Sequence, residues 1–350
     1  MHVTPRPERR DDPNFPLRMA VLATISVGMI PFIMPSMPPI LASLPIGLMA
    51  GMRKAFDPKK AIGGPVALIV MIWLASGLLT LLMPWPAAFV IAVASLYFIG
   101  FYLIQSTGNP MGMLVLISVG LTSIIGMNSI AALDSLRDTF AEAGIFTMIA
   151  IPILYFLLPP ATREMMIEDY TPASGNHVYS ALIRAAVLLA LSFWLYSFLG
   201  ASNMMLVIAA IFVLCFPTRE RTFAEAWQRV RATIRGASAA GFVLFIMTLN
   251  AHFFMLVGLV FLVALYFSGK MMSGRHPPMV YQFSLSVALS LIVGGLTTQE
   301  PSYAVLTRVA LTFGGTIAAA VVTATLESLL LSPDRQVVPK KRRDPNPAME

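Results

Sequence analysis

The chain has 350 residues, of which 57% are hydrophobic and only 12% charged, and its mean hydropathy is +0.78. A soluble domain of this size cannot keep so apolar a surface in water, so the composition indicates a polytopic membrane protein. The net charge is +7 and Cys215 is the single cysteine. One cysteine excludes a disulfide framework and a cysteine metal cluster, and its apolar surroundings predict a small buried side chain.

The first sixteen residues are polar and rich in proline. They contain neither the apolar region nor the small-residue cleavage site that a signal peptide requires. We therefore expect residues 1–16 to form a cytoplasmic tail and the first apolar helix to be a retained span.

Twelve apolar stretches follow along the chain, and about 20 apolar residues are needed for a helix to cross a bilayer. The stretches at 38–52, 202–216 and 236–250 are short, so we expect them to be tilted, re-entrant or buried. The twelve expected spans are 17–35, 38–52, 62–83, 86–105, 110–128, 141–158, 179–199, 202–216, 236–250, 252–268, 279–297 and 305–331.

The basic residues predict the orientation of these spans. With both termini in the cytoplasm, only Arg137 and Arg308 of the 24 Lys and Arg residues fall on the outer side. This distribution obeys the positive-inside rule. The positive net charge therefore reports topology, and we do not expect nucleic acid as a partner.

The chain contains an internal duplication. The sequence LRMAVLATIS around Arg18 returns as IRAAVLLALS around Arg184. Likewise, NPMGMLVLISVGLTSIIG from Asn109 returns as PPMVYQFSLSVALSLIVG from Pro277. Because each copy holds an even number of spans, the copies enter the membrane in the same direction, as parallel repeats do.

The last helix of each copy carries the same arginine. Arg137 stands seven residues before Gly144, and Arg308 stands seven residues before Gly315. The predicted fold is all-α and integral to the membrane, with about twelve transmembrane helices in two parallel six-helix repeats. The expected domains are a tail at 1–16, a first repeat at 17–160, a cytoplasmic linker at 161–177, a second repeat at 178–333 and a basic cytoplasmic tail at 334–350.

Arg137 and Arg308 form an outer pair of candidate substrate-binding residues. A guanidinium near the membrane boundary is costly unless it is paired or hydrated, and it is a permanently charged fork for carboxylates. The pair therefore predicts an anion-binding group near the outer mouth of a path. The alternative is that Arg137 pairs with Asp134, Asp138 or Glu142 and only fixes a loop.

Arg18 and Arg184 form a second repeated pair at the cytoplasmic entrance. If both pairs line one route, a substrate anion meets positive charge at each end and an apolar middle that binds it weakly enough to let it leave. We therefore count Arg18 and Arg184 as candidate substrate-binding residues. The alternative is ordinary positive-inside anchoring of the first helix of each repeat.

Between the eighth and ninth expected spans, Phe223, Trp227, Val230 and Ile234 recur at helical spacing with arginines between them. This pattern predicts an amphipathic helix lying in the inner membrane interface. Such a helix serves as a surface strut, and the alternative is a gate or a docking element for a partner.

Glu327 and His252 are the candidates for proton coupling, because each places an ionisable side chain in or beside an expected span. Neither residue recurs in the other repeat, and the alternative is that each ties helices together. The sequence contains no GxxxxGK[ST] phosphate loop, no HExxH motif and no GxSxG motif. We therefore expect no ATP hydrolysis, no enzymatic activity, no cofactor and no metal site, and a membrane acyltransferase and a structural or regulatory protein stand as the alternatives.

The two six-span halves each open with an arginine-led helix (LRMAVLATIS, IRAAVLLALS) and have a basic inner loop near the third span. This layout resembles the fusaric acid resistance and aromatic acid exporter group over residues 17–333, and plant aluminium-activated malate transporters resemble its single-half architecture. The resemblance implies export of organic anions, often aromatic carboxylates, across a bacterial inner membrane with a periplasmic adaptor of the membrane-fusion type. It also implies that basic residues in the spans handle the carboxylate. Larger members carry a soluble domain between the halves, whereas only residues 161–177 connect them here, which leaves regulation and energy coupling open.

The expected function is therefore efflux of organic anions, with aromatic carboxylates as the substrates the resemblance favours. Proton-coupled antiport is the expected energy source because ATP machinery is absent. A passive anion channel and a non-transporting component of a larger complex are the alternatives. The expected partners are the lipid bilayer, the substrate anion, a periplasmic adaptor and a second copy of the chain.

Overall fold

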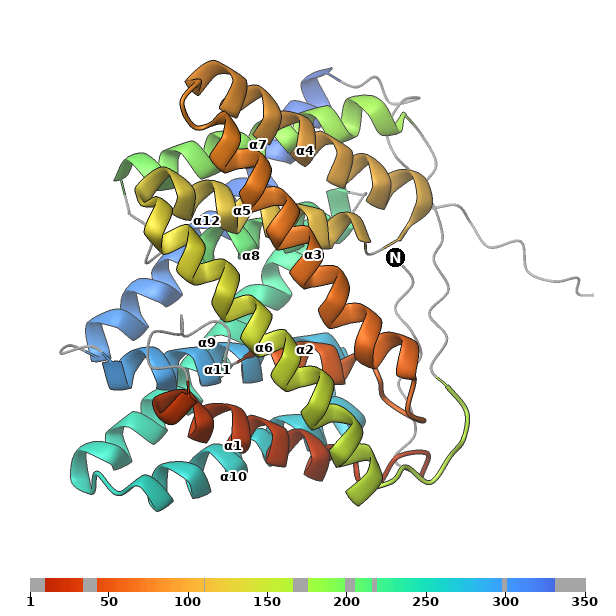
Figure 1. Cartoon of the computed structure of the whole chain (residues 1–350), viewed down its shortest axis with the longest axis vertical. Helices are drawn as coiled ribbons and strands as arrows, with labels where there is room; N and C mark the ends of the chain where they lie inside the picture. Colours follow the sequence, from red (N-terminus) through yellow and green to blue (C-terminus); the bar gives the residue numbers. More distant parts are fainter. Residues whose placement is uncertain are drawn as a thin grey trace, which may run out of the picture.

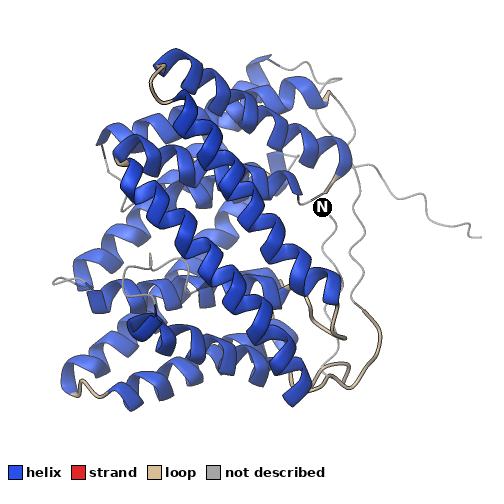
Figure 2. Ribbon diagram, viewed as in Figure 1, coloured by secondary structure: helices blue, strands red, loops and turns tan. Residues whose placement is uncertain are grey.

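A computed structural model describes residues 10–33, 43–109, 111–165, 176–198, 205–215, 219–297 and 301–330. Within these ranges the chain forms twelve α-helices and no strand (Figure 2), so the prediction of an all-α protein is confirmed. Both expected tails lie largely outside the described residues, as does the middle of the linker at 166–175.

The helices are α1 (Phe15–Ile33), α2 (Leu44–Ala50), α3 (Pro58–Leu82), α4 (Pro86–Thr107), α5 (Met111–Asn128), α6 (Ile130–Leu157), α7 (His177–Phe198), α8 (Met205–Leu214), α9 (Arg219–Leu249), α10 (Phe253–Ser273), α11 (Pro278–Thr297) and α12 (Pro301–Leu330). We call α1–α6 the first half and α7–α12 the second half.

Local sequence explains several helix ends. The Asp57 carboxylate caps α3 by accepting from the backbone amides of Lys59 at 3.0 Å and Lys60 at 3.3 Å. A side-chain acceptor here satisfies amides that have no partner within the helix, and the proline that follows suits the first helical position. The next helix, α4, ends at Gly108. The φ of Gly108 is 73°, a left-handed conformation that glycine adopts without strain.

Eight of the described helices are long and apolar enough to cross a membrane, namely α3, α4, α6, α7, α9, α10, α11 and α12. Shorter apolar stretches occupy Phe15–Gly28 of α1 and Met111–Met127 of α5. In contrast, α2 has 7 residues and α8 has 10. At 1.5 Å per residue they rise about 10 and 15 Å, well short of a bilayer core of about 30 Å. The described parts of the second and eighth expected spans therefore do not cross a bilayer as helices.

The prediction of a separate amphipathic helix before the ninth span is wrong. A single 31-residue helix, α9, runs from Arg219 to Leu249 through both segments. Phe223, Trp227 and Ile234 of the expected apolar stripe are 39–51% exposed, whereas Val230 is buried. The buried face of this segment instead includes Arg229, one of the arginines expected between the apolar residues, together with Glu225.

The first helix of each half packs against the fourth helix of the other half. Figure 1 shows α1 beside α10 at one end of the molecule and α4 near α7 at the opposite end, and both pairs are in extensive contact. Further contacts follow the same correspondence: α3 packs on α5 and α6 as α9 packs on α11 and α12, and α2 packs on α6 and α11 as α8 packs on α12 and α5. Among the described residues, every helix pair in substantial contact has its counterpart six helices along the chain.

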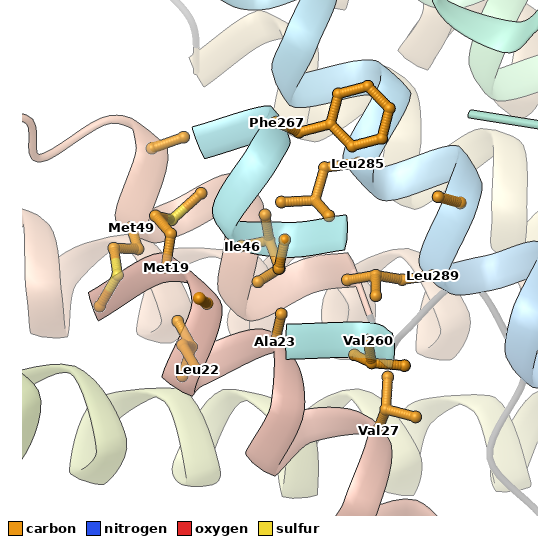
Figure 3. Packing of buried hydrophobic residues seen from close by; sticks show 14 of the residues in the cluster. Met19, Leu22, Ala23, Val27, Ile46, Met49, Val260, Phe267, Leu285 and Leu289 are labelled. Atoms are coloured by element: carbon orange, nitrogen blue, oxygen red, sulfur yellow. The ribbon is translucent and has the colours of Figure 1, made fainter. Parts of the chain in front are cut away.

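Each of the two largest hydrophobic clusters contains side chains from both halves. In the largest cluster, side chains of α1 and α2 pack against side chains of α10 and α11 (Figure 3), including Met19, Leu22, Ile46, Met49, Val260, Phe267, Leu285 and Leu289. A second cluster joins α4 and α5 to α7 and α8, with Tyr97, Phe101, Leu188 and Ile211 among its members. Because burying apolar side chains drives association, the two halves are held together by a shared core.

Candidate functional site

Arg18, the fourth residue of α1, is completely buried. Its guanidinium forms an ion pair with Asp12, donates a hydrogen bond to the Leu158 carbonyl at 2.6 Å, and lies 4.1 Å from the ring centroid of Tyr155. The Tyr155 hydroxyl in turn donates to the Met52 carbonyl. Arg18 therefore joins the start of α1, the end of α6 and the segment after α2.

The charges around this centre perturb one another. Burial raises the pKa of the Asp12 carboxyl, and the Arg18 charge and the Lys54 backbone amide oppose that shift. Lys54 itself bonds to Glu164 at 3.2 Å, and this hydrogen bond raises the pKa of the Lys54 amine. These links attach the segment between α2 and α3 to the residues that follow α6.

Arg184, the eighth residue of α7, is also completely buried. Its Nη2 lies 2.8 Å from the Glu327 carboxylate, and its Nη1 donates to the Leu214 carbonyl at 2.6 Å. With its amide turned so that the oxygen faces the donors, Gln105 accepts from Arg184 Nε at 3.1 Å and from the Ser180 hydroxyl at 3.2 Å. Arg184 therefore joins α7, α8 and α12 to α4 of the first half.

Arg18 and Arg184 hold equivalent positions and make equivalent contacts. Each has a carboxylate partner and a backbone carbonyl partner, and each meets the end of the last helix of its own half. Because both side chains are 0% exposed, neither guanidinium offers a surface that an anion can reach in this conformation. Their predicted role in substrate binding stays a prediction, and the geometry gives them a role in tying helix ends.

The two proton-coupling candidates lie in different environments. Glu327 of α12 is the counter-ion of Arg184, and its side chain is 12% exposed. His252 is exposed and immediately precedes α10, where its backbone amide donates to the Asn250 carbonyl at 3.0 Å. His252 is therefore a turn residue, whereas Glu327 is part of a buried ion pair.

Arg137 and Arg308 occupy the same position, the eighth residue, in α6 and α12. Arg137 is 28% exposed and lies 3.2 Å from Asp134 and 3.6 Å from Asp138. Its guanidinium also lies 4.3 Å from the ring centroid of Trp73 in α3. Arg137 thus pairs with two of the three acidic residues, Asp134, Asp138 and Glu142, that the alternative interpretation named as its partners in fixing a loop. The side chain of Arg308 lies outside what the structure describes.

Sequence reasoning missed a buried ion pair on α9. Arg229 Nε lies 2.8 Å from the Glu225 carboxylate, and the two side chains are only 7% and 6% exposed. The guanidinium lies 4.2 Å from the ring centroid of Phe212 in α8 and also sits over the ring of Phe283 in α11. Its Nη2 is buried without a hydrogen-bond partner. The spacing of four residues between a glutamate and a following arginine is the signal that could have found it.

We call Glu225, Arg229, Phe212 and Phe283 the junction site. Phe212 also packs against an apolar cluster of the first half that contains Leu68, Leu121 and Phe140. The site therefore lies where the two halves meet. Arg229 has one guanidinium donor without a partner and lies against two aromatic rings that pack on each other, and such a group can bind a carboxylate attached to an apolar body.

A cavity of about 870 Å³ opens between α9, α10, the turn that follows α10, and α11. Its described lining contains several basic side chains and no acidic one. Desolvation and the charges of Arg235, Arg231 and Arg275 lower the pKa of His276 in this turn. We call this cavity the basic pocket; the lining used below consists of Ile234, Arg235, Leu262, Val263, Tyr266, Lys270, Arg275, His276 and Tyr281.

Neither site has the ligands of a metal centre. Among the residues that the structure describes, no group of three or more His, Cys, Asp and Glu side chains is placed to hold a metal ion. The chemistry available at both sites is recognition of an anion by guanidinium and ammonium groups beside aromatic rings.

The long apolar helices and the buried charges define a multi-pass, all-helical membrane protein. Residues 187–322, which extend from α7 into α12, match the model of the fusaric acid resistance protein-like family. The expected family resemblance is therefore confirmed over this part of the second half. The family is one of membrane transporters, which favours transport over enzymatic activity. No curated protein and no solved structure gives a significant match to the chain.

Proposed function

We propose that the protein exports organic anions, with aromatic carboxylates as substrates, across a bacterial inner membrane. In this proposal the two halves are parallel six-helix repeats and both termini are cytoplasmic. The correspondence of helix contacts between the halves and the distribution of basic residues support this arrangement. A periplasmic adaptor and a second copy of the chain are the proposed partners.

The observation that carries the proposal is the junction site. Arg229 has one buried donor without a partner, and its guanidinium lies against two phenylalanine rings. An aromatic carboxylate supplies what is missing, because its carboxylate pairs with the guanidinium and its ring packs beside Phe212 and Phe283. In the structure, the Glu225 carboxylate pairs with Nε of the same guanidinium, so it competes with the substrate for the charge of Arg229.

Glu225 also links substrate binding to protonation. When a substrate carboxylate pairs with Arg229, the displaced Glu225 carboxylate is left buried without its counter-ion, which strongly favours its protonation. Substrate and proton then bind and leave this site together. Export driven by inward proton flow requires the opposite coupling, and Glu327 and His252 stay the candidates for that proton carrier.

The four arginines predicted from the sequence take supporting roles in this proposal. Arg137 and Arg308 attract the anion at the outer mouth of the path. Arg18 and Arg184 contact the substrate only in a conformation that separates the helix ends they now join.

The test compares transport of 1-naphthoate and its neutral methyl ester in vesicles that contain the full chain. Arg229→Gln should lower naphthoate transport by at least about tenfold, since a hydrogen bond to a charged group contributes roughly 1.5–3 kcal/mol. Glu225→Gln should lower the KM for naphthoate and weaken the dependence of that KM on pH. Arg231→Gln is the matched control, because Arg231 is an exposed arginine on the same helix.

A substrate-binding role for the pair predicts opposite effects on naphthoate transport: Arg229→Gln weakens it and Glu225→Gln lowers its KM. If Arg229→Gln and Glu225→Gln lower transport equally and the double variant recovers it, the pair is a structural ion pair and the assignment of the site is wrong. Saturable flux that an uncoupler abolishes supports an exporter, whereas flux that only follows the anion gradient identifies a channel. Absence of naphthoate flux in every variant, with an adaptor supplied, contradicts the transport proposal itself.

A further inference from the structure

We propose that the basic pocket binds the phosphate headgroup of an anionic phospholipid from the inner leaflet of the membrane. The proposal depends on the orientation given above, but not on which anion is transported. It assigns the pocket to a lipid that belongs to the working protein, separate from the substrate at the junction site.

The first argument is charge. Arg235, Lys270 and Arg275 line the pocket, and the described lining contains no carboxylate that could neutralise them. Among the described residues none of the three takes part in an ion pair, and Arg235 Nη1 is buried without a hydrogen-bond partner. A buried donor on a charged group is costly unless it is paired, so the pocket favours an anionic occupant.

The second argument is the arrangement of the aromatic side chains. Lys270 Nζ lies 5.8 Å from the ring centroid of Tyr266, and the Arg235 guanidinium lies 5.7 Å from that of Tyr281. Both tyrosines flank the same basic end of the pocket. Tyrosine and basic side chains at one level are typical of the headgroup region of a membrane, and basic pockets between helices on the cytoplasmic side bind lipid headgroups.

The third argument is the direction in which the lining changes from charged to apolar. Lys270 stands eight residues after Leu262 on α10, a rise of about 12 Å. Leu262 is 60% exposed, and Val263 beside it also lines the pocket. The basic end therefore lies toward the turn after α10, and the apolar side chains of Leu262 and Val263 lie nearer the middle of that helix. A phospholipid has this same order of headgroup and acyl chains.

The fourth argument is the absence of the same charges in the first half. The turn between α4 and α5, which corresponds to the turn after α10, carries Thr107, Gly108 and Asn109. A general requirement for positive charge at inner turns would act on both halves. Of the two corresponding turns, only the one after α10 carries basic residues, and a specific anionic ligand explains this difference.

The test measures lipid retention by the full-length protein. Protein from vesicles of phosphatidylcholine mixed with phosphatidylglycerol is extracted in mild detergent, and the lipids that remain bound are counted by native mass spectrometry. The double variant Arg235→Gln/Lys270→Gln should retain phosphatidylglycerol about 25-fold less than wild type, since each basic residue contributes roughly a factor of five. Lys59→Gln/Lys60→Gln removes the same charge from the start of α3 and should retain lipid as wild type does.

Three outcomes would overturn the proposal. Equal loss in the control variant means that the attraction is diffuse. Displacement of the lipid by inorganic phosphate alone assigns the pocket to free phosphate, and displacement by 1-naphthoate assigns it to the transported anion. Recovery of retention by Arg235→Lys/Lys270→Arg, together with an unchanged unfolding temperature of the Gln variant, separates loss of binding from misfolding. Naphthoate transport, measured in parallel, shows whether the proposed function fails independently.

Discussion

The third helices of the two halves, α3 and α9, have corresponding neighbours, but only α9 buries an ion pair beside its apolar residues. α3 contributes Leu68 and Ile72 to an apolar cluster that it shares with α5 and α6. α9 instead buries Glu225 and Arg229 among aromatic side chains. The packing arrangement thus tolerates very different side chains, and the two halves differ most in where they bury charge.

The arginine centres show a second difference of the same kind. Arg18 obtains its carboxylate from Asp12, just before its own helix, whereas Arg184 obtains one from Glu327 at the end of α12. Both halves bury a guanidinium, but its carboxylate partner precedes the first helix in one half and belongs to the last helix in the other. Both halves therefore bury a cation that joins helix ends, and the two carboxylates that pair with it come from different places in the fold.

The largest expected effect comes from breaking one arginine centre. Arg184→Leu leaves the Glu327 carboxylate largely buried without its partner, which should lower the free energy of unfolding by about 3–5 kcal/mol. Arg18→Leu should cost a similar amount if the centres are equivalent. Unfolding of the purified protein in detergent, followed by tryptophan fluorescence, measures both.

The double variant Arg184→Leu/Glu327→Leu is the control for this prediction. It removes both charges and should recover more than half of the lost stability, because no unpaired charge remains. If the double variant is less stable than Arg184→Leu alone, the centre contributes through its backbone hydrogen bonds and not through the ion pair.

A smaller effect is expected where α4 and α5 approach closely in the first half. A Cβ atom at Gly112 would clash with the Gly100 carbonyl oxygen, so Gly112→Ala should destabilise by about 1–3 kcal/mol. Gly258 of α10 has no atom within 4 Å of its added Cβ, so Gly258→Ala should be neutral or slightly stabilising. Equal thermal shifts for the two variants would contradict the close approach.

Arg137→Ala should change stability by no more than about 1 kcal/mol, because Arg137 and its acidic partners are partly exposed. Its effect on transport is a separate question. The double variant Arg137→Ala/Arg308→Ala should lower naphthoate transport at an unchanged membrane level if the outer arginines attract the anion. Unchanged transport would leave Arg137 with the fixing role that Asp134 and Asp138 indicate.

The smallest effect concerns pH. Because its surroundings lower the pKa of His276, this side chain is neutral near pH 7 and gains its charge only as the pH falls below its ordinary value. Phosphatidylglycerol retention should therefore increase modestly between about pH 7 and about pH 5. His276→Gln should remove this dependence, and a dependence that persists would assign it elsewhere. The surrounding groups are Arg231 and Arg235 of α9, Lys270 of α10, Arg275 of the turn and Tyr281 of α11.

Composition and hydrophobic length were sufficient to predict an all-helical membrane protein, because a bilayer accepts few other folds. The sequence also indicated the family and singled out Arg18, Arg184 and Arg137. It counted α2 and α8 among the twelve spans while expecting both to be tilted, re-entrant or buried, and their described parts are helices of 7 and 10 residues. An apolar segment can be buried inside the protein or can cross the bilayer, so the length of the apolar stretch alone cannot distinguish these two cases.

Tertiary structure decided which charges are buried and what they contact. The sequence predicted that Arg229 belongs to a basic cytoplasmic segment. In the structure this segment is part of the long helix α9, and the Arg229 side chain packs against Phe212 and Phe283. The carboxylate that neutralises Arg184 is 143 positions away along the chain. The packing of α1 against α10, and of α7 against α4, likewise cannot be read from the repeated sequence segments. Local sequence determines which helices form, whereas the partners of a buried charge depend on contacts between segments that are distant in the chain.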